Sequence, residues 1–256
     1  MASIEIDGVT LELQQIDSGA GTGRAPIVFL HEGLGSVAMW REWPAQVCEA
    51  TGRAGLVYSR RGYGTSEPIP DVRGSGRLAA DYMHQEAWTV LPRLLQALAI
   101  ERPVLLGHSD GGSIALLHAS RHPVAACIVM APHVMVEEVS LRSIGAARDS
   151  YEAAIRERLS RYHADVDGAF WQWNDVWLSE SFRSFDIRAE CRTIEAPVLA
   201  IQGWEDAYGS MRQIEEIAPT RGAVTLEKLA ECGHSPHRDQ PGLTRTLVRE
   251  FLAPLP

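Results

Sequence analysis

The sequence predicts an α/β fold, in which a mostly parallel, twisted sheet carries helices on both faces and a helical lid is inserted over one edge. Short continuous apolar runs alternate with longer stretches of helical spacing, which is typical of parallel strands joined by crossover helices. The 256 residues are 45% hydrophobic and 22% charged, as expected for a domain with a sizeable core. One aromatic segment that is poor in strand patterns interrupts the alternation.

The first predicted element is an antiparallel hairpin, because alternating runs at 4–6 and 11–16 flank the turn dipeptide Asp7-Gly8. Continuous apolar runs then predict buried parallel strands, both of whose faces are covered. These runs span residues 26–30, 55–58, 103–106, 125–130, 197–201 and 223–226. Helical patterns between and after them span residues 40–50, 78–98, 112–120 and 243–251.

Residues 134–193 are predicted to form the lid, which leaves 1–133 and 194–256 as the core domain. The segment has helical spacing from 143 to 162, followed by the aromatic residues Phe170, Trp171, Trp173, Trp177, Phe182 and Phe185. Because regularly spaced aromatics on a helix usually pack together, half of them or more are expected to form the lid's own core. The others are expected to line an apolar substrate cleft, with Trp171 and Trp177 as candidates.

Residues 107–111, Gly-His-Ser-Asp-Gly, form a G-x-S-x-G motif between a predicted strand and a predicted helix. In this context the motif lifts a nucleophilic serine out of the sheet edge, so Ser109 is the candidate nucleophile. Side chains at Gly107 and Gly111 would collide with the backbone of such a sharp turn. The N-terminus of the following helix favours a developing oxyanion.

A serine hydroxyl needs a base and an orienting acid to attack at neutral pH. The base is expected in the loop before the last helix, at His234, whose preceding glycine lets the loop turn inward. His237, in the same loop, is interpreted as a residue behind the base or in the cleft. The acid is expected after the strand at 197–201, where Asp206 suits a tight turn and Glu205 is the reserve.

The backbone N–H groups of Asp110 and Gly33 are the candidate oxyanion donors, with Leu34 as the alternative to Gly33. Glycines in the loop after the strand at 26–30 let the backbone turn its N–H groups toward a substrate carbonyl. The Asp110 side chain is expected to cap the helix that begins there. Leu34 and His108 lie beside these groups in sequence and are expected to line the cleft.

Together these motifs resemble the α/β-hydrolase superfamily over nearly the whole chain. The resemblance rests on the hairpin, the loop at 31–35, the segment at 58–64, the motif at 107–111, the lid, and the acid and base loops, and the order nucleophile, acid, base is the order of that fold. It implies the α/β-hydrolase fold. Members with a Ser-His-Asp triad are mostly ester hydrolases, lactonases, carbon–carbon bond hydrolases, thioesterases and iminopeptidases.

One residue departs from the family pattern, because Glu32 stands where many relatives have glycine. A carboxylate facing the substrate would oppose the negative charge of an oxyanion. We therefore expect Glu32 to point away from the substrate and to pair with Arg60 or Arg61.

The predicted reaction is hydrolysis of a small or medium carboxylic ester or lactone through an acyl-enzyme. A carbon–carbon bond hydrolase acting on a ring-cleavage product is an alternative with the same three residues. It would need a cationic anchor for a substrate carboxylate, for which Arg142, Arg148 and Arg183 are candidates. A non-catalytic ligand receptor on the same fold is a further alternative.

Composition restricts the partners. The net charge is −9, from 24 Lys and Arg against 33 Asp and Glu, which disfavours nucleic acid. No apolar run is long enough to span a membrane, and the N-terminus lacks a signal-peptide pattern. The four scattered cysteines are expected to be reduced. These observations predict a cytoplasmic protein with no membrane partner. No cofactor or metal motif is evident. The expected partner is a small-molecule substrate, and a homodimer formed through an exposed lid stays open.

Overall fold

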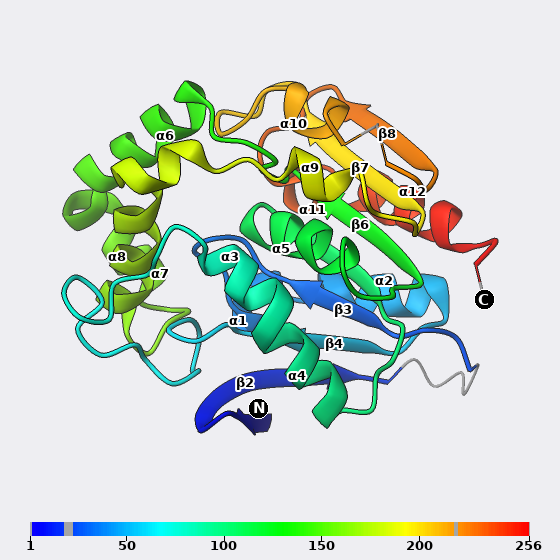
Figure 1. Cartoon of the computed structure of the whole chain (residues 1–256), viewed down its shortest axis with the longest axis horizontal. Helices are drawn as coiled ribbons and strands as arrows, with labels where there is room; N and C mark the ends of the chain where they lie inside the picture. The colour runs from blue at the N-terminus through cyan, green and yellow to red at the C-terminus, as the bar shows by residue number, and fades with distance from the viewer. Residues whose placement is uncertain (1, 18–22, 218–219, 256) are drawn as a thin grey trace.

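Eight strands form one sheet in the computed structural model, which describes residues 2–17, 23–217 and 220–255 (Figure 1). The strands are β1 (Ala2–Ile6), β2 (Val9–Ile16), β3 (Ile27–Leu30), β4 (Gly55–Tyr58), β5 (Val104–His108), β6 (Ala126–Met130), β7 (Val198–Gly203) and β8 (Val224–Leu229). Their order in the sheet is β1-β2-β4-β3-β5-β6-β7-β8. The pairs β1–β2 and β2–β4 are antiparallel and the other five are parallel. The predicted fold class is confirmed.

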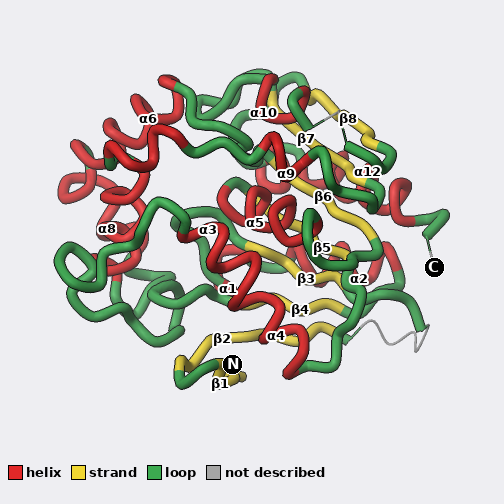
Figure 2. Tube along the Cα trace, in the orientation of Figure 1, coloured by secondary structure: helices red, strands yellow, loops and turns green. Residues whose placement is uncertain are grey.

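Helices cover both faces of the sheet (Figure 2). The helices of the core are α1 (Val37–Trp40), α2 (Trp43–Thr51), α3 (Tyr82–Gln85), the π-helical turn η1 (Glu86–Val90), α4 (Leu91–Ala97), α5 (Asp110–Ala119), α10 (Arg212–Glu215), α11 (Pro236–Asp239) and α12 (Pro241–Leu252). Alternate residues of β3 pack into two separate apolar clusters: Val28 and Leu30 face α3, α4 and α5, whereas Ile27 and Phe29 face α1, α2 and α12. None of the helices in the described ranges combines the length and apolar content that a membrane crossing requires.

Two predicted helices are interrupted, one by a residue with positive φ and the other by a π-helical turn. The one predicted at 40–50 is divided by Arg41, which has a positive φ of 53°. The one predicted at 78–98 begins at Tyr82 and contains the π-helical turn η1 just before Pro92. Because proline has no N–H to donate to the preceding turn, a π turn at this place relieves the mismatch.

The segment between β6 and β7 is mostly helical, as its spacing predicts. It contains α6 (Glu138–Asp149), the π-helical turn η2 (Tyr151–Ile155), α7 (Arg156–Leu159), α8 (Val166–Trp177), the 3-10 turn η3 (Glu180–Ser184) and α9 (Arg188–Cys191). Figure 1 shows α6, α7 and α8 beyond the carboxyl ends of the parallel strands. That this segment acts as a lid stays a prediction.

Candidate active site

Ser109 lies at the sharp turn between β5 and α5, with a φ of 53° and a ψ of −120°. A Cβ at Gly107 would lie 2.1 Å from the carbonyl oxygen of Gly111, and a Cβ at Gly111 would lie 2.0 Å from that of Leu30. Only glycine fits at these two positions, so the crowding expected from the motif is present. The turn holds the serine in a strained conformation that is typical of functional sites.

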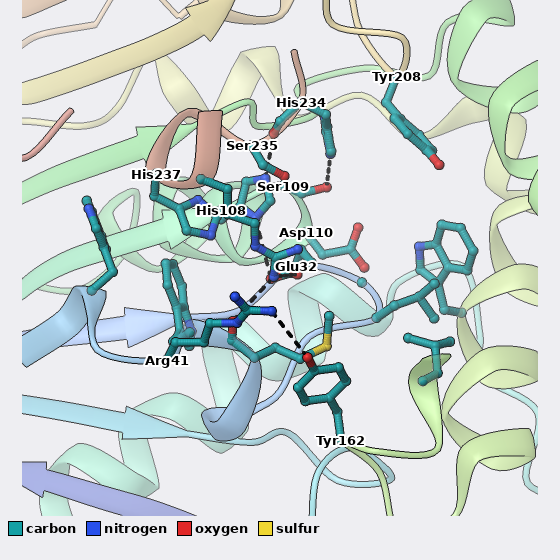
Figure 3. A pocket seen from close by; sticks show the side chains of 18 of the residues that line it. Glu32, Arg41, His108, Ser109, Asp110, Tyr162, Tyr208, His234, Ser235 and His237 are labelled. Carbon is teal, nitrogen blue, oxygen red and sulfur yellow. Dashed lines mark hydrogen bonds and ion pairs between the residues drawn. The ribbon is translucent and has the colours of Figure 1, made fainter. Parts of the chain in front are cut away.

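Three side chains from three strand ends form a continuous hydrogen-bonded chain. Figure 3 labels two of them, Ser109 and His234, at the cavity. Nε2 of His234 lies 2.9 Å from Oγ of Ser109, and Nδ1 of His234 lies 2.9 Å from both carboxylate oxygens of Asp206. The Asp206 side chain is 1% exposed, whereas that of His234 is 18% exposed. The structure therefore brings together the three residues that the sequence singles out, within the reach that proton transfer requires.

The Asp206 carboxylate is also held by its own loop. It accepts hydrogen bonds from the side-chain amide of Gln202 and from the backbone N–H of Tyr208, both at 2.7 Å. Burial alone would raise the pKa of Asp206, but the hydrogen bond and charge of His234 hold that pKa below its ordinary value. Asp206 is thus ionised at neutral pH and can stabilise an imidazolium at His234.

The loop that carries His234 is shaped by Glu205, the residue kept in reserve as the acid. Its carboxylate accepts the backbone N–H of Cys232 at 2.8 Å and of Glu231 at 3.3 Å, so it fixes the base loop instead of touching the imidazole. The residue with positive φ in this loop is Glu231, not Gly233. The backbone conformation that favours glycine thus occurs two residues before Gly233, and the expectation that Gly233 lets the loop turn inward stays a prediction.

A cavity of about 1000 Å³ opens over Ser109. It is lined by the loop after β3, by α1 and α2, by the base loop, and by side chains of the helical segment. Leu34, His108 and Trp177 line it, at the place predicted for the cleft, and so does the buried His237.

Gly33 lines the same cavity, and Trp173 of α8 packs directly over it. A Cβ at Gly33 would lie 2.2 Å from Nε1 of Trp173, so the loop has no room for a side chain there. Asp110 is the first residue of α5, so its backbone N–H has no acceptor within the helix. Both candidate oxyanion donors therefore lie at the cavity that contains Ser109.

The expected capping role of the Asp110 side chain is wrong. Its buried carboxylate instead accepts the hydroxyl of Tyr82 at 2.6 Å and Nε1–H of Trp177 at 3.3 Å. Burial raises the pKa of Asp110, against the opposing influence of Arg60. The side chain therefore links the nucleophile turn to α3 and α8 through these two hydrogen bonds.

The predicted partner of Glu32 is also wrong. Its carboxylate pairs with Arg238 at 3.0 Å and lies 3.4 Å from Nδ1 of His108, on the side of α11. Arg60 instead donates to the backbone carbonyls of His31 and Glu32. Burial would raise the pKa of Glu32, but contact with His108 and the charge of Arg238 keep it well below its ordinary value. The turn after β3 aims the carboxylate toward the base loop, which sequence neighbours could not indicate.

The prediction for Trp171 is wrong, because this side chain does not line the cavity. The guanidinium carbon of Arg73 lies over the Trp171 ring, 3.8 Å from the ring centroid. Trp173 lines the cavity instead. Residues two apart on a helix point about 200° apart, so only one of the two can face the site. The sequence gives no sign of how α8 is rotated.

The arginines proposed as anchors for a substrate carboxylate also lie elsewhere. Arg142, Arg148 and Arg183 do not line the cavity, and the last two contact Asp149 and Glu138. The arginines that do line the cavity are Arg41, Arg158, Arg161 and Arg238. Within the described ranges, the first three have no carboxylate within 4.0 Å. Arg41 donates to the hydroxyl of Tyr162 (Figure 3).

Sequence reasoning missed His133, which lies just after β6. Its Nε2 is 3.4 Å from Oγ of Ser109, and the residue is 2% exposed. Its place directly after a parallel strand, at the edge where Ser109 lies, is the signal that could have identified it.

The comparisons with known proteins agree with this geometry. Residues 27–245 match the Alpha/beta hydrolase family. A proline iminopeptidase of Lactobacillus delbrueckii subsp. lactis is 35% identical over 100 residues, 39% of this chain and 32% of that protein, so the match spans about a third of the relative. A 2-hydroxymuconate semialdehyde hydrolase of Pseudomonas sp. is 24% identical over 93% of this chain and 89% of its own.

Among solved structures, the enol-lactonase of Burkholderia xenovorans LB400 superposes with a TM-score of 0.75 at 22% identity. The match covers 98% of this chain and all of that one. This likeness supports the fold assigned from the sheet topology. Since the family match covers most of the sequence and the fold agrees with it, this chain belongs to the α/β hydrolase family.

Proposed function

We propose that this protein is a serine hydrolase that cleaves a small or medium carboxylic ester or lactone through an acyl-enzyme. The observation that carries the proposal is the hydrogen-bonded chain from Asp206 through His234 to Ser109, with 2.9 Å at each link, beneath a cavity of about 1000 Å³. A buried acid, an oriented imidazole and a strained serine are the parts that activate a hydroxyl for acyl transfer.

In the proposed first step, Oγ of Ser109 attacks the substrate carbonyl carbon and His234 Nε2 takes the hydroxyl proton. Asp206 stabilises the resulting imidazolium. The backbone N–H groups of Gly33 and Asp110 would hold the oxyanion, and one such donor typically contributes about 2.7–4 kcal/mol. His234 then gives its proton to the leaving oxygen. In the second step it accepts a proton from the water that releases the acid.

The cavity favours a substrate with an apolar part. Leu34, Trp173 and Trp177 line it next to Ser109, and the helical segment adds Ile144 and Ile155. Apolar walls with a few convergent polar groups are typical of small-molecule sites. We infer that the segment at 134–193 covers the substrate as a lid.

A panel of p-nitrophenyl esters and aliphatic lactones tests the proposal. We expect turnover of short to medium acyl chains by the wild-type protein and none above background by Ser109→Ala. Absence of turnover with every ester and lactone would contradict the proposal, and binding without turnover would favour a receptor.

A second candidate is hydrolysis of a carbon–carbon bond in a ring-cleavage product that carries a carboxylate. Arg41, Arg158 and Arg161 line the cavity without a carboxylate partner in the described parts of the chain, which would suit an anionic group. The semialdehyde hydrolase named above is similar over most of this chain. Turnover of a coloured vinylogous dienoate in preference to the esters, with a sharp loss in Arg158→Gln, would favour this candidate.

A further inference from the structure

A second histidine, His133, reaches the candidate nucleophile beside the imidazole of His234. His133 follows β6, and Ala131, two residues before it, has a positive φ of 46°. Nε2 of His133 then lies 3.4 Å from Oγ of Ser109, compared with 2.9 Å for Nε2 of His234. The hydroxyl oxygen therefore lies within hydrogen-bond reach of two imidazoles.

The backbone and the ring of His133 are both held by neighbouring side chains. Oγ of Ser113, on α5, accepts the backbone N–H of His133 at 2.9 Å and donates to the carbonyl oxygen of His133 at 2.7 Å. The imidazole packs edge-on against Trp177, with 4.8 Å between ring centroids, and 5.7 Å from the ring of His234. These contacts hold the ring over Ser109.

The proton on His133 can be placed from its surroundings. Burial and the charge of His234 lower the pKa of His133 to about 3, so the ring is neutral at neutral pH and carries one N–H. The Ser109 hydroxyl donates its proton to His234, which leaves a lone pair on Oγ. This lone pair can accept a hydrogen bond from His133 when the ring proton is on Nε2 and Nδ1 is unprotonated. Nδ1 is buried and has no hydrogen-bond partner in the described chain.

We propose that His133 is a second catalytic histidine, whose Nε2–H donates a hydrogen bond to Oγ of Ser109 and stabilises the charge that develops on this oxygen. The inference rests on the proposed acyl-enzyme mechanism. Nothing in the family match or in the G-x-S-x-G motif assigns this residue.

His133 keeps its proton throughout the reaction. During attack, the bond from Oγ to the carbonyl carbon forms, the carbonyl electron pair moves to its oxygen, and the Oγ proton passes to His234. When water releases the acyl group, the bond from carbon to Oγ breaks, its electron pair returns to Oγ, and Oγ regains a proton from His234. The donor from His133 is strongest when Oγ is most negative, and hydrogen bonds of this kind often shorten as a reaction proceeds.

Two variants separate a donor role from a packing role. His133→Gln keeps a neutral N–H near the place of Nε2, whereas His133→Leu fills similar space without a donor. We expect His133→Leu to lower kcat on a p-nitrophenyl ester, and the rate of Ser109 labelling by a fluorophosphonate, about 10–100-fold with KM little changed. His133→Gln recovers most of that loss. The matched control is His122→Leu, since His122 lies past the end of α5 and away from the cavity.

The outcomes distinguish this inference from the proposed function. If the wild-type protein is not labelled at Ser109, the proposed function fails. If the wild-type protein is labelled and both His133 variants react at its rate, or if both lose the same activity, only the donor role of His133 is overturned.

A measurement on the wild-type protein keeps the inference testable even if His133→Leu does not fold. The ¹⁵N NMR shifts of His133 near pH 7.5 are expected to show a protonated Nε2 and an unprotonated Nδ1. A ring protonated on Nδ1 would overturn the proposal. Ser113→Ala keeps the imidazole but removes the two hydrogen bonds that hold its backbone, so it is expected to reduce kcat less than His133→Leu does.

Discussion

The carboxyl edge of the sheet and the helical segment at 134–193 both contribute to the cavity, but their sequences differ in what they reveal. At the sheet edge, Ser109, Asp206 and His234 each lie in a short turn that directly follows a strand. In the helical segment, Trp171 and Trp173 are both aromatic neighbours on α8, yet only Trp173 lines the cavity. Turns carry local signals of chemistry, whereas the face that a helix presents depends on packing against distant residues.

The largest expected effect tests the sheet edge alone. Asp206→Asn keeps the shape of the acid but removes the charge that stabilises the imidazolium, so we expect kcat on p-nitrophenyl esters to fall about 10⁴-fold. Glu205→Gln is the matched control, because Glu205 only holds the base loop through Cys232 and Glu231. Its loss is expected to stay below tenfold. A larger loss in Glu205→Gln than in Asp206→Asn would assign the acid to Glu205.

The next effect joins the two regions. Gly33→Ala places a Cβ where Trp173 lies, so either the β3 loop or α8 must shift and the candidate oxyanion donor moves with it. We expect kcat to fall about 10²-fold, as when an oxyanion donor is lost. Gly145→Ala is the control: it lies in α6 with nothing within 4 Å of a new Cβ. It should raise the free energy of unfolding by about 0.5–1 kcal/mol and leave kcat unchanged.

Features marked by neighbouring residues could be predicted from the sequence, whereas contacts between distant residues could not. The strand runs, the G-x-S-x-G turn and the order of acid and base identify the fold and the three side chains that meet, because each is marked by residues next to it. The partner of Glu32 could not be predicted, since Arg238 is 206 residues away in the chain. The same holds for the Asp110 carboxylate, whose donors are on α3 and α8.

The rotation of α8 gives a third prediction, on substrate choice. Trp173→Leu removes a wall of the cavity and is expected to change relative kcat/KM across a series of acyl chain lengths by about tenfold. Trp171→Leu should leave that series unchanged, since Trp171 packs under Arg73 outside the cavity. If Trp171→Leu changes the preference and Trp173→Leu does not, the orientation of α8 is wrong.

The smallest expected effect is on how the free energy of unfolding depends on pH. His133 has a folded pKa of about 3, below the ordinary unfolded value of about 6.5, so it favours the folded state above pH 6.5 and this contribution is lost as the pH falls toward 3. His234, His108 and Asp206 are the titratable groups that act on it. Chemical unfolding measures this contribution. When the pH is lowered from 7.5 to 5.5, the free energy of unfolding of the wild-type protein should fall by about 1.4 kcal/mol more than that of His133→Gln. A constant difference would contradict the burial of a neutral ring.

We propose that His234, oriented by Asp206, makes Ser109 nucleophilic. Labelling with a fluorophosphonate, followed by peptide mapping, identifies the nucleophile. We expect one modified residue, Ser109, labelled far more slowly in His234→Ala and Asp206→Asn. Modification at another residue, or labelling of Ser109 at the same rate in His234→Ala, would contradict it.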